Sequence, residues 1–432
     1  IYIRILSSLP KKVLGFLTNH FLRARRWDED REMEVKGYDS RLVCYQLVTM
    51  MELLKGIFSV RVLFIGVFVL FIYFALQLIA VTETNFKTKN IANVTKVILF
   101  WNGFFSNLSW ELPSSSSKLH VGNEECIFTN NHNFLPRVEQ FDALLFHAAV
   151  SFKHPPQRDP KQQYVFALKE APPQTHNLLT KKENFYNLTM TYRLDSDVHW
   201  PYSYVFDAKT GQRVAPTQYP HWKNSSFFEE FVPSSGLLQQ LKEKRKSIAW
   251  FVSHCKTSSK RENLVKSLQK YIQVDIYGSC GTLRYNDCNE ILDNDYKFYL
   301  SFENSLCIDY VTEKLFNALN RKVVPIVFGG ANYDRFAPPH SYINVEDFKT
   351  VEDLASFLIL LEKNIDEYAK YYWWKDFYLV SIYKDNYTIP ATYYELCAKL
   401  HNTPTNGMQF YKNIEEYWNW RMCRVQSNIK FS

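Results

Sequence analysis

The sequence has few cysteines, no strong charge bias and no glycine-rich nucleotide motif. Its 432 residues include eight cysteines, none spaced C-x-x-C, which excludes a disulfide scaffold and disfavours a structural zinc site. The net charge of +7 is modest, and with 16% aromatic residues it indicates packed domains rather than a nucleic-acid partner. Neither a P-loop nor a G-x-G-x-x-G turn is present, so ATP hydrolysis and NAD binding lack their usual signatures.

The chain does contain one long apolar run, at residues 62–81. The run carries no charge, and only Gln77 is clearly polar. As a helix it would be about 30 Å long, which matches the apolar thickness of a bilayer. A buried core helix is rarely apolar on every face, and a cleaved signal peptide fits the length and the long leader worse. We therefore expect a signal anchor at 62–81, a cytoplasmic tail at 1–61 and a short polar stem at 82–95.

The orientation of this anchor is not set by charge, because three basic residues lie on each side of the run. Five N-x-S/T sequons follow the run and lean weakly toward a lumenal location: Asn93, Asn107, Asn187, Asn224 and Asn386. Met50 or Met51 would open a short basic tail typical of a signal anchor. We therefore expect residues 1–49 to be upstream or mis-assigned sequence.

Beyond the stem, short apolar runs separated by polar or Pro-rich stretches predict a first α/β domain at 96–240. The runs VILFWNGFF (97–105), DALLFHA (142–148) and YVFALKE (164–170) have the length of buried strands. The chain then becomes rich in Pro, polar and basic residues, ending in KEKRKS (242–247). This change of composition predicts a domain boundary.

From Ile248 onward, apolar strands alternate with amphipathic helices. Strands are expected at IAWFVS, VDIYG, YKFYLSFE and VVPIVFG, and helices at SKRENLVKSLQKYI, VTEKLFNALNR and VEDLASFLILLEKN. This βαβ pattern predicts a parallel sheet covered on both faces, with ligands at the carboxyl ends of its strands. We expect a second domain at 246–400 and a C-terminal tail at 401–432.

Polar residues follow these strands at positions where a nucleotide sugar could bind. Glu303 and Asn304 end the strand at YKFYLSFE, and a carboxylate with an amide suits sugar hydroxyls. Lys314 lies beside Thr312 at the start of the next helix, where backbone N–H groups favour phosphate. Arg261 near the start of an earlier helix is a further phosphate candidate. A strand-ending turn and a plain Thr N-cap explain the same residues, so both interpretations stay open.

The segment YKFYLSFENSLCIDYVTEKLFNALNRKVVPIVFGGANYDRFAPPHSYINVEDF closely resembles the central signature of the α-1,3-fucosyltransferases, invertebrate members above all. Weaker resemblances extend from KVILFWNGFF through LKEAPP and LTMTYRLDSDV to ELCAKL, so that residues 96 to about 400 are covered. The resemblance implies a Golgi type II membrane protein with a lumenal catalytic region. It also implies the GT-B arrangement of two Rossmann-like domains, the first facing the acceptor and the second holding GDP-fucose.

The resemblance also implies roles for particular residues. Glu170 in LKEAPP matches the general base, and Arg261 with Lys314 and the helix beginning at Thr312 matches the diphosphate clamp. Inverting glycosyl transfer needs both a base for the acceptor hydroxyl and stabilisation of the departing diphosphate. Without the resemblance, Glu170 reads equally well as a solvated strand-end carboxylate. The nucleotide and the fucose would be lined by Glu303, Asn304, Tyr310 and Glu313.

A metal-dependent alternative comes from Asp195 and Asp197, because D-x-D spacing holds Mn²⁺ against a nucleotide-sugar diphosphate in the other large glycosyltransferase fold. Here the triplet lies in the first domain, inside a stretch that resembles the family's own pattern. Two cationic side chains already face the diphosphate. We therefore expect no metal site and no required cofactor, with Mn²⁺ at most stimulatory.

These observations predict an enzyme that moves L-fucose from GDP-β-L-fucose to the 3-hydroxyl of GlcNAc on N-glycans or related glycans, with inversion. An inactive, membrane-anchored glycan-binding protein of the same fold and a GT-B transferase for another nucleotide sugar remain alternatives. The sequence does not distinguish a core GlcNAc from an outer, Lewis-type GlcNAc. Seven cysteines follow the apolar run, and an odd number leaves at least one unpaired in a monomer or joined to another chain.

Overall fold

The computed structural model describes residue 73 and residues 95–430, with gaps at 106, 109, 176–182, 225, 285–286, 382–389 and 404–408. The chain divides into one unit at residues 1–92 and another at 93–432. The predicted tail, anchor and stem lie outside the described residues, except for Tyr73 and Thr95. Within the described part of the chain, no helix has the length and apolar character needed to cross a bilayer.

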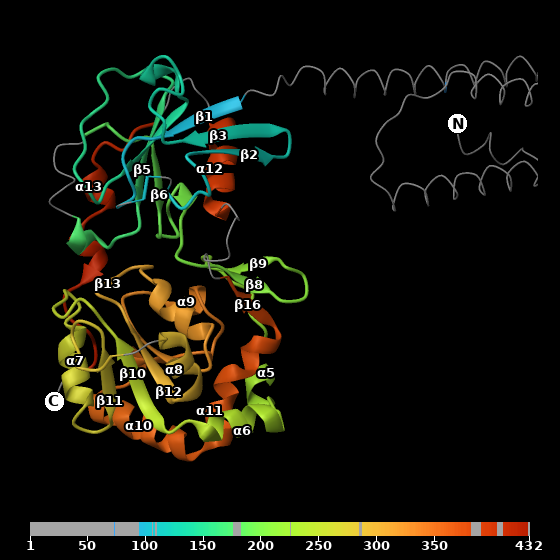
Figure 1. Ribbon diagram of the computed structural model, residues 1–432, viewed down its shortest axis with the longest axis vertical. Helices are drawn as coiled ribbons and strands as arrows, with labels where there is room; N and C mark the ends of the chain where they lie inside the picture. The colour runs from blue at the N-terminus through green and yellow to red at the C-terminus, as the bar shows by residue number, and fades with distance from the viewer. Residues whose placement is uncertain are drawn as a thin grey trace, which may run out of the picture. The chain divides into compact units, whose positions relative to one another are not determined.

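The first of two large sheets has seven strands in the order β2-β3-β1-β4-β5-β6-β7 (Figure 1). All neighbouring strands are parallel except β2 and β3. All six residues of β5 are buried, as expected for a strand covered on both faces. The bounds are β1 Thr95–Phe100, β2 Ser116–Val121, β3 Glu124–Thr129, β4 Ala143–His147, β5 Gln163–Leu168, β6 Leu188–Thr191 and β7 Val198–His199.

The second sheet has five strands in the order β11-β10-β12-β14-β15, and every neighbouring pair is parallel. Every strand and helix predicted from Ile248 onward is found in the predicted order, which confirms the α/β class with parallel sheets, but the helix between β11 and β12 and the short strand β15 were not predicted. The strands are β10 Lys246–Phe251, β11 Val274–Tyr277, β12 Tyr296–Phe302, β14 Val324–Phe328 and β15 Ile343–Asn344. The helices between and after them are α7 Arg261–Leu268, α8 Cys288–Asn294, α9 Glu313–Leu319 and α10 Val351–Lys363.

Smaller elements complete the described part of the chain. A three-stranded sheet has the order β16-β8-β9, and β13 pairs with β17. Their bounds are β8 Val205–Asp207, β9 Arg213–Ala215, β13 Leu306–Cys307, β16 Tyr378–Val380 and β17 Cys423–Arg424. The remaining α-helices are α5 Ser226–Glu229, α6 Ser235–Glu243, α11 Ile365–Ala369, α12 Ala391–Asn402 and α13 Ile414–Tyr417. A 3₁₀ turn, η4, spans Tyr333–Arg335.

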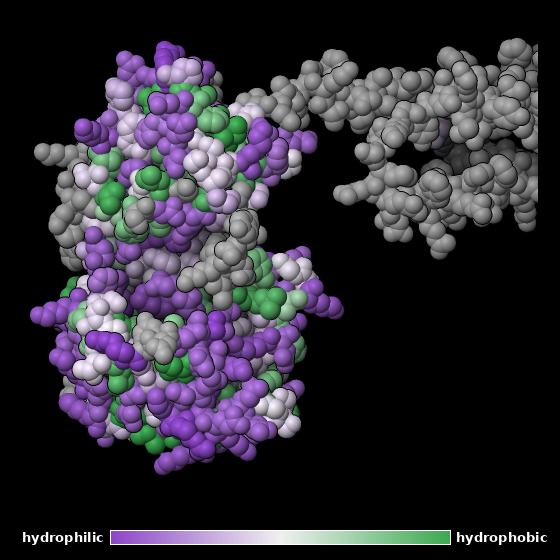
Figure 2. Space-filling model, viewed as in Figure 1, coloured by the Kyte–Doolittle hydropathy of each residue, from purple (hydrophilic) through white to green (hydrophobic). Residues whose placement is uncertain are grey.

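Helix α10 shows how the local sequence sets an element and its packing. Thr350 caps its start, because the Thr350 Oγ1 accepts from the Asp353 N–H at 3.1 Å and the Asp353 carboxylate accepts from the Thr350 N–H at 3.1 Å. Leu354, Leu358 and Leu361 recur at helical spacing and are buried against the second sheet. Leu360 lies on the opposite face and is 66% exposed. In the view of Figure 2 the surface is mostly hydrophilic, with scattered apolar residues.

The C-terminal part of the chain contains elements that pack on the first sheet as well as elements that pack on the second. Sequence analysis assigns 246–400 to the second domain, whereas α12 packs on the first sheet through residues such as Leu396. The disulfide Cys126–Cys397 joins α12 to β3, and β17 pairs with β13 next to the disulfide Cys307–Cys423. The apolar face of a helix does not reveal which sheet it covers. The boundary expected between 240 and 246 itself stays a prediction.

Three disulfides and one free thiol account for the cysteines of the described residues. The third disulfide is Cys255–Cys280, and Cys288 is unpaired, in agreement with the odd count. Of the sequons, Asn107 and Asn224 are exposed. Asn187 is buried, and its side-chain amide donates to the Gln409 carbonyl at 3.0 Å.

The packing of α10 makes a stability prediction with an internal control. Leu358→Ala removes a fully buried side chain and should lower the free energy of unfolding by about 2 to 5 kcal/mol. Leu360→Ala removes a mostly exposed side chain from the same helix and should change it by less than about 1 kcal/mol. Urea unfolding of the two purified variants measures the difference. Equal losses would show that α10 does not pack as described.

Candidate active site

Glu170 lies just beyond the carboxyl end of β5, in the first sheet. Its side chain is partly buried, and among the described residues no hydrogen bond or ion pair holds its carboxylate. Burial raises the pKa of Glu170 above its ordinary value, because a charged carboxylate is poorly solvated there. The charges of Lys314, His254 and Lys169 oppose that rise, and Glu313 adds to it. Groups from both sheets therefore act on one carboxylate.

Glu303 follows β12 in the second sheet and is 0% exposed. Its carboxylate accepts from the Thr312 N–H at 2.8 Å and from the Thr312 hydroxyl at 2.9 and 3.0 Å. The Lys314 ammonium lies 3.4 Å from the second oxygen. Burial raises the pKa of Glu303, while Lys314 acts to lower it. Glu303 therefore lies against the start of α9, where Thr312 and Lys314 hold its carboxylate.

Lys314 lies in the first turn of α9, and its side chain is 23% exposed. Its ammonium donates to the Thr312 Oγ1 at 2.8 Å and to the Glu313 Oε1 at 2.9 Å. Burial acts to lower the pKa of Lys314, but Glu303 and Glu313 outweigh it and raise the pKa, so the side chain stays charged. The chain thus presents a fixed cation at this end of α9.

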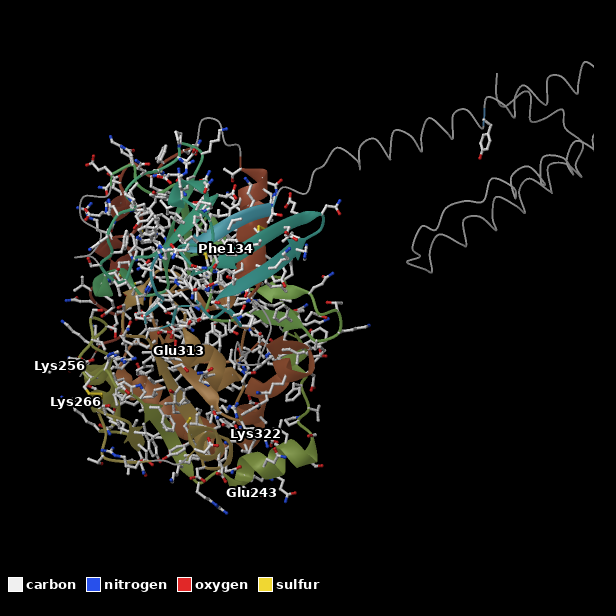
Figure 3. All side chains as sticks on the ribbon, turned by 45° about the horizontal axis from the view of Figure 1, so that its top comes forward. Phe134, Glu243, Lys256, Lys266, Glu313 and Lys322 are labelled. Atoms are coloured by element: carbon white, nitrogen blue, oxygen red, sulfur yellow. A yellow bond between two sulfur atoms is a disulfide. The ribbon has the colours of Figure 1, made fainter. Side chains whose placement is uncertain are left out.

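Glu313 is the more open of the two carboxylates beside Lys314, with a side chain that is 52% exposed. Burial acts to raise its pKa, but the charge of Lys314 and their hydrogen bond outweigh this effect and lower it. Figure 3 shows Glu313 in the middle of the described residues, whereas Lys256 and Lys266 lie at the edge. Glu313 is therefore far more exposed than Glu303.

Arg261 is the first residue of α7 and is 4% exposed. Its guanidinium donates to the carbonyls of Phe302 and His254, which fixes it behind the end of β12. Burial lowers the pKa of Arg261, and Glu303 opposes that change. Its Nε is buried without a hydrogen-bond partner among the described residues.

Asn304 follows Glu303 and is half-buried. Its backbone carbonyl accepts from the Ser259 N–H and from the Ser258 hydroxyl, both at 3.0 Å. Its side-chain Oδ1 is buried and, within the described part of the chain, has no hydrogen-bond partner. Ser258 and Ser259 were not among the predicted site residues, and the Ser-rich stretch before Arg261 is the sequence signal that could have identified them. Their role is to attach the loop after β10 to the end of β12.

Tyr310 lies between β13 and α9 and is 2% exposed. Its ring lies 4.9 Å from the ring of Tyr192, which follows β6 in the first sheet, and 6.2 Å from that of Tyr202. Burial raises the pKa of the Tyr310 hydroxyl well above its ordinary value, so it is a neutral donor. Tyr310 therefore lies in a loop of the second sheet and contacts a loop of the first sheet.

Lys169 is a further site residue that sequence analysis missed. It is 7% exposed, and its ammonium lies 5.0 and 4.7 Å from the rings of Trp200 and Tyr202. The Tyr202 hydroxyl donates to the Lys169 carbonyl at 2.6 Å, immediately before Glu170 in the chain. In the sequence, Lys169 directly precedes Glu170 at the end of a strand, and such a neighbouring pair is typical of the solvent-exposed surface. The burial of Lys169 depends on aromatic residues more than thirty positions away.

Comparison with known proteins decides the family. The profile described as "Fucosyltransferase, N-terminal" matches residues 93–203, and that described as "Glycosyltransferase family 10 (fucosyltransferase) C-term" matches residues 241–418. Alpha-(1,3)-fucosyltransferase C of Drosophila melanogaster is 45% identical over 357 residues, which cover 78% of this chain and 80% of that protein. The chain belongs to the family 10 fucosyltransferases. The resemblance found in the sequence is thereby confirmed.

Two further comparisons describe how far the likeness extends. Glycoprotein 3-alpha-L-fucosyltransferase A of Drosophila melanogaster is 32% identical to this fucosyltransferase over 370 residues, covering 80% of this chain and 66% of that protein. A crystal structure of an α1,3-fucosyltransferase with GDP-fucose is 18% identical, with a TM-score of 0.44, and covers 72% of this chain and 91% of that chain.

The D-x-D triplet of this fucosyltransferase is held by protein groups. The Asp195 carboxylate is paired with the Arg193 guanidinium. The Asp197 carboxylate accepts from the Thr189 N–H at 3.0 Å and from the Tyr411 hydroxyl at 2.9 Å. The two side chains therefore serve separate structural contacts. A group of potential metal ligands among the described residues, Cys126, Cys397 and His401, contains a disulfide, whose sulfurs are not thiolate ligands.

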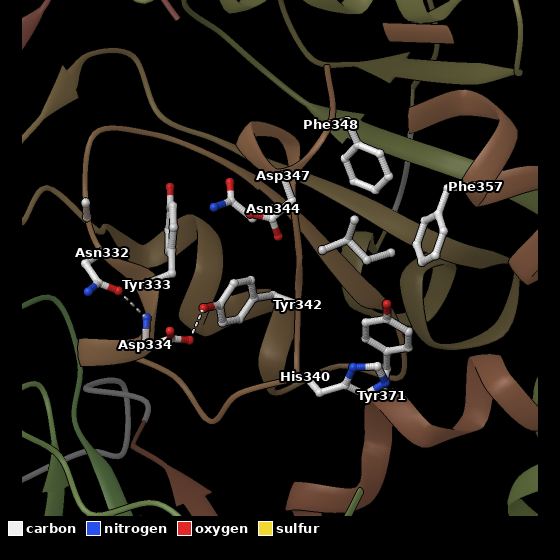
Figure 4. Close-up of a pocket in the computed structure, with 12 residues that line it drawn as sticks. Asn332, Tyr333, Asp334, His340, Tyr342, Asn344, Asp347, Phe348, Phe357 and Tyr371 are labelled. Atoms are coloured by element: carbon white, nitrogen blue, oxygen red, sulfur yellow. Dashed lines mark hydrogen bonds between the residues drawn. The ribbon is translucent and has the colours of Figure 1, made fainter. Parts of the chain in front are cut away.

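A pocket of about 440 Å³ lies at the carboxyl ends of β14 and β15 (Figure 4). Aromatic and acidic residues line it, among them Tyr342, Tyr371, Asp334 and Asp347, and the Tyr342 hydroxyl donates to Asp334 at 2.6 Å. None of the predicted site residues lines this pocket. The fucosyltransferase thus keeps its predicted donor residues outside it, around the ends of β10 and β12.

The contacts of Asp195 and Asp197 predict how the fucosyltransferase responds to chelation. Activity should survive EDTA with at most a several-fold loss, because protein groups already hold the Asp195 and Asp197 carboxylates. A radiochemical transfer assay with and without Mn²⁺ measures the effect. Near-complete loss that Mn²⁺ restores would reinstate a metal at the diphosphate.

Proposed function

We propose that this fucosyltransferase moves L-fucose from GDP-β-L-fucose to the 3-hydroxyl of a GlcNAc residue on N-glycans or related glycans, with inversion. The proposal rests mainly on the position of Glu170. Glu170 follows a strand of the first sheet, and the charge of Lys314, which belongs to the second sheet's helix α9, acts on the pKa of its carboxyl group. A displacement reaction needs a base for the attacking hydroxyl and a cation for the departing diphosphate, and here the two groups come from different sheets. The α-(1,3) linkage is supported by the names of the two Drosophila relatives.

Glu170 is the proposed general base. Its raised pKa makes it a stronger proton acceptor than an ordinary carboxylate, and no hydrogen bond from a described residue occupies its oxygens. As the acceptor oxygen attacks the anomeric carbon, Glu170 takes the hydroxyl proton, and the bond from that carbon to the GDP oxygen breaks. Because attack and departure occur on opposite sides, the β-configured donor gives an α-fucoside.

The second sheet supplies the proposed donor site. Lys314 carries a fixed charge that a departing diphosphate requires, and Arg261 supplies a second charge with an Nε that has no partner among the described residues. The unsatisfied Oδ1 of Asn304, the Tyr310 hydroxyl and the exposed Glu313 carboxylate offer hydrogen bonds to the nucleotide and the fucose. Glu303 supports this arrangement from below, through Thr312. The reaction needs no cofactor, and Mn²⁺ at most stimulates it.

We place the protein in the Golgi membrane as a single-pass type II protein with its catalytic region in the lumen. The support is the apolar run at residues 62–81 and the family of the chain. The sequons that follow the run are compatible with this orientation.

Product analysis tests the proposed reaction. The purified protein is incubated with GDP-fucose and a released N-glycan that has terminal and core GlcNAc. Mass spectrometry should show a gain of one deoxyhexose, and linkage analysis should place it on a GlcNAc 3-hydroxyl. Glycan binding without GDP release would indicate an inactive glycan-binding protein, and transfer from a different nucleotide sugar would indicate a different donor.

Substitutions of Glu170 and Lys314 should affect different steps. Glu170→Gln keeps the size of the side chain but cannot accept the proton, so kcat should fall by roughly 100-fold or more with GDP affinity little changed. Lys314→Ala removes a charge from the bound diphosphate as well as from the leaving group, so GDP affinity should also fall, by about 1.5 to 3 kcal/mol. Steady-state kinetics and calorimetric titration with GDP measure the two effects.

Two exposed residues provide matched controls for these variants. Glu243→Gln on α6 and Lys322→Ala beyond α9 make the same chemical changes on the surface and should leave kcat and GDP affinity near those of the unmodified protein. Near-normal turnover of Glu170→Gln would mean that another group is the base. Normal GDP binding by Lys314→Ala would remove that residue from the diphosphate site.

A further inference from the structure

Asp309 occupies an unusual position between β13 and α9. It is 6% exposed, and its φ of +58° lies in the left-handed region, which few residues other than Gly, Asn and Asp adopt readily. It directly precedes Tyr310 and lies five residues before Lys314. A buried carboxylate in a left-handed conformation beside the donor residues suggests a specific positioning role.

The Asp309 carboxylate joins three segments of the fold. One oxygen accepts from the Leu194 N–H at 3.2 Å, and Leu194 lies beyond β6 of the first sheet. The other oxygen lies 4.0 Å from the Arg335 guanidinium, in the turn η4 that follows β14 of the second sheet. Asp309 itself belongs to the loop that leads into α9. The contact with Leu194 therefore crosses from one sheet to the other.

Strand pairing links this contact to the proposed base. In the first sheet, β5 and β6 are paired in register, with Leu168 opposite Thr191. Glu170 lies two residues beyond Leu168, and Leu194 lies three residues beyond Thr191. Because neighbouring strands are about 4.8 Å apart, the segment after β6 that Asp309 contacts leaves the sheet next to the segment after β5 that carries Glu170.

A second contact beside the first strengthens the same connection. The ring of Tyr310 lies 4.9 Å from the ring of Tyr192, so two successive residues of the donor loop contact two positions of the segment after β6. Rings at this separation attract each other and exclude water. The hydrogen bond from Leu194 then fixes the register of this contact.

We propose that Asp309 is a positioning residue that sets the distance between Glu170 and the donor groups around Lys314. The proposal rests on the function proposed above for Glu170 and Lys314. The Asp309 carboxylate holds the segment after β6, and with it the end of β5, against the loop that leads into α9. A displacement of the base by about 1 Å costs roughly 100-fold in rate, whereas GDP is held by second-sheet residues alone. Asp309 therefore affects the transfer step and not donor binding.

Three substitutions separate the hydrogen bond from the backbone conformation. Asp309→Gly retains the left-handed backbone but loses the acceptor, so kcat should fall roughly 10- to 100-fold with the Kd for GDP unchanged within about twofold. Asp309→Asn tolerates the same backbone and keeps an oxygen that can accept from Leu194, so kcat should stay within about threefold of the unmodified protein. Asp309→Ala loses the acceptor and strains the backbone, and it should be impaired at least as much as Asp309→Gly.

A matched control is available at Asn184, an exposed residue with a φ of +51° in the first half of the chain. Asn184→Gly makes the corresponding change at a left-handed position away from the site and should leave kcat and GDP binding unaltered. Normal GDP binding by Asp309→Gly also shows that this variant is folded. The readout is the split between kcat and the Kd for GDP, which general destabilisation would not produce.

The outcomes distinguish this proposal from the function on which it rests. Unchanged kcat in Asp309→Gly would overturn the positioning role while leaving Glu170 and Lys314 untouched. A parallel loss of kcat and GDP affinity would assign Asp309 to the donor site and also overturn the role. If kcat fell as far in Asp309→Asn as in Asp309→Gly, the charge that faces Arg335 would be the cause of the effect. That result would contradict the role given to the hydrogen bond from Leu194. Failure of Glu170→Gln to slow turnover would instead contradict the proposed function.

Discussion

A carboxylate with no access to water must find its partners inside the protein, and Glu303 is 0% exposed. Its partners are the N–H and hydroxyl of Thr312 and the ammonium of Lys314, all at the start of α9. Leaving such a charge without a partner would cost about 3 to 5 kcal/mol. The place where α9 begins, and the position of its lysine, are therefore coupled to the end of β12. The proposed donor site depends on this coupling.

The acceptor side is built differently. Glu170 has no such set of partners among the described residues, and burial together with a balance of distant charges sets its pKa. The role proposed for Glu170 needs this freedom, because oxygens already occupied by hydrogen bonds accept a proton poorly. The two carboxylates thus illustrate two uses of burial. Glu303 is hydrogen-bonded and ion-paired at the start of α9, whereas the Glu170 carboxylate has no such partner among the described residues. Asp309 itself contacts the segments that follow β6 and β14.

The sequence predicted the parts of this site that depend on local pattern. Apolar runs gave the strands that end at Glu170 and Glu303, and the change to helical spacing after Thr312 placed Lys314 at the start of a helix. Local pattern does not show which distant segments meet. The return of α12 to the first sheet, the aromatic surroundings of Lys169 and the contact of Asp309 with Leu194 all join residues far apart in the chain. For the same reason, the burial of Glu303 beneath α9 could not be predicted.

We propose a single displacement, in which a base from the first sheet and cations from the second act on opposite sides of the sugar. This arrangement fixes the stereochemistry of the product, whatever acceptor is used. Proton NMR spectroscopy of the fucosylated product made from GDP-β-L-fucose reads the anomeric configuration directly. The account predicts an α-linked fucose. A β-linked product would require two successive displacements and a nucleophile on the enzyme, and it would contradict the assignment of Glu170 as the base.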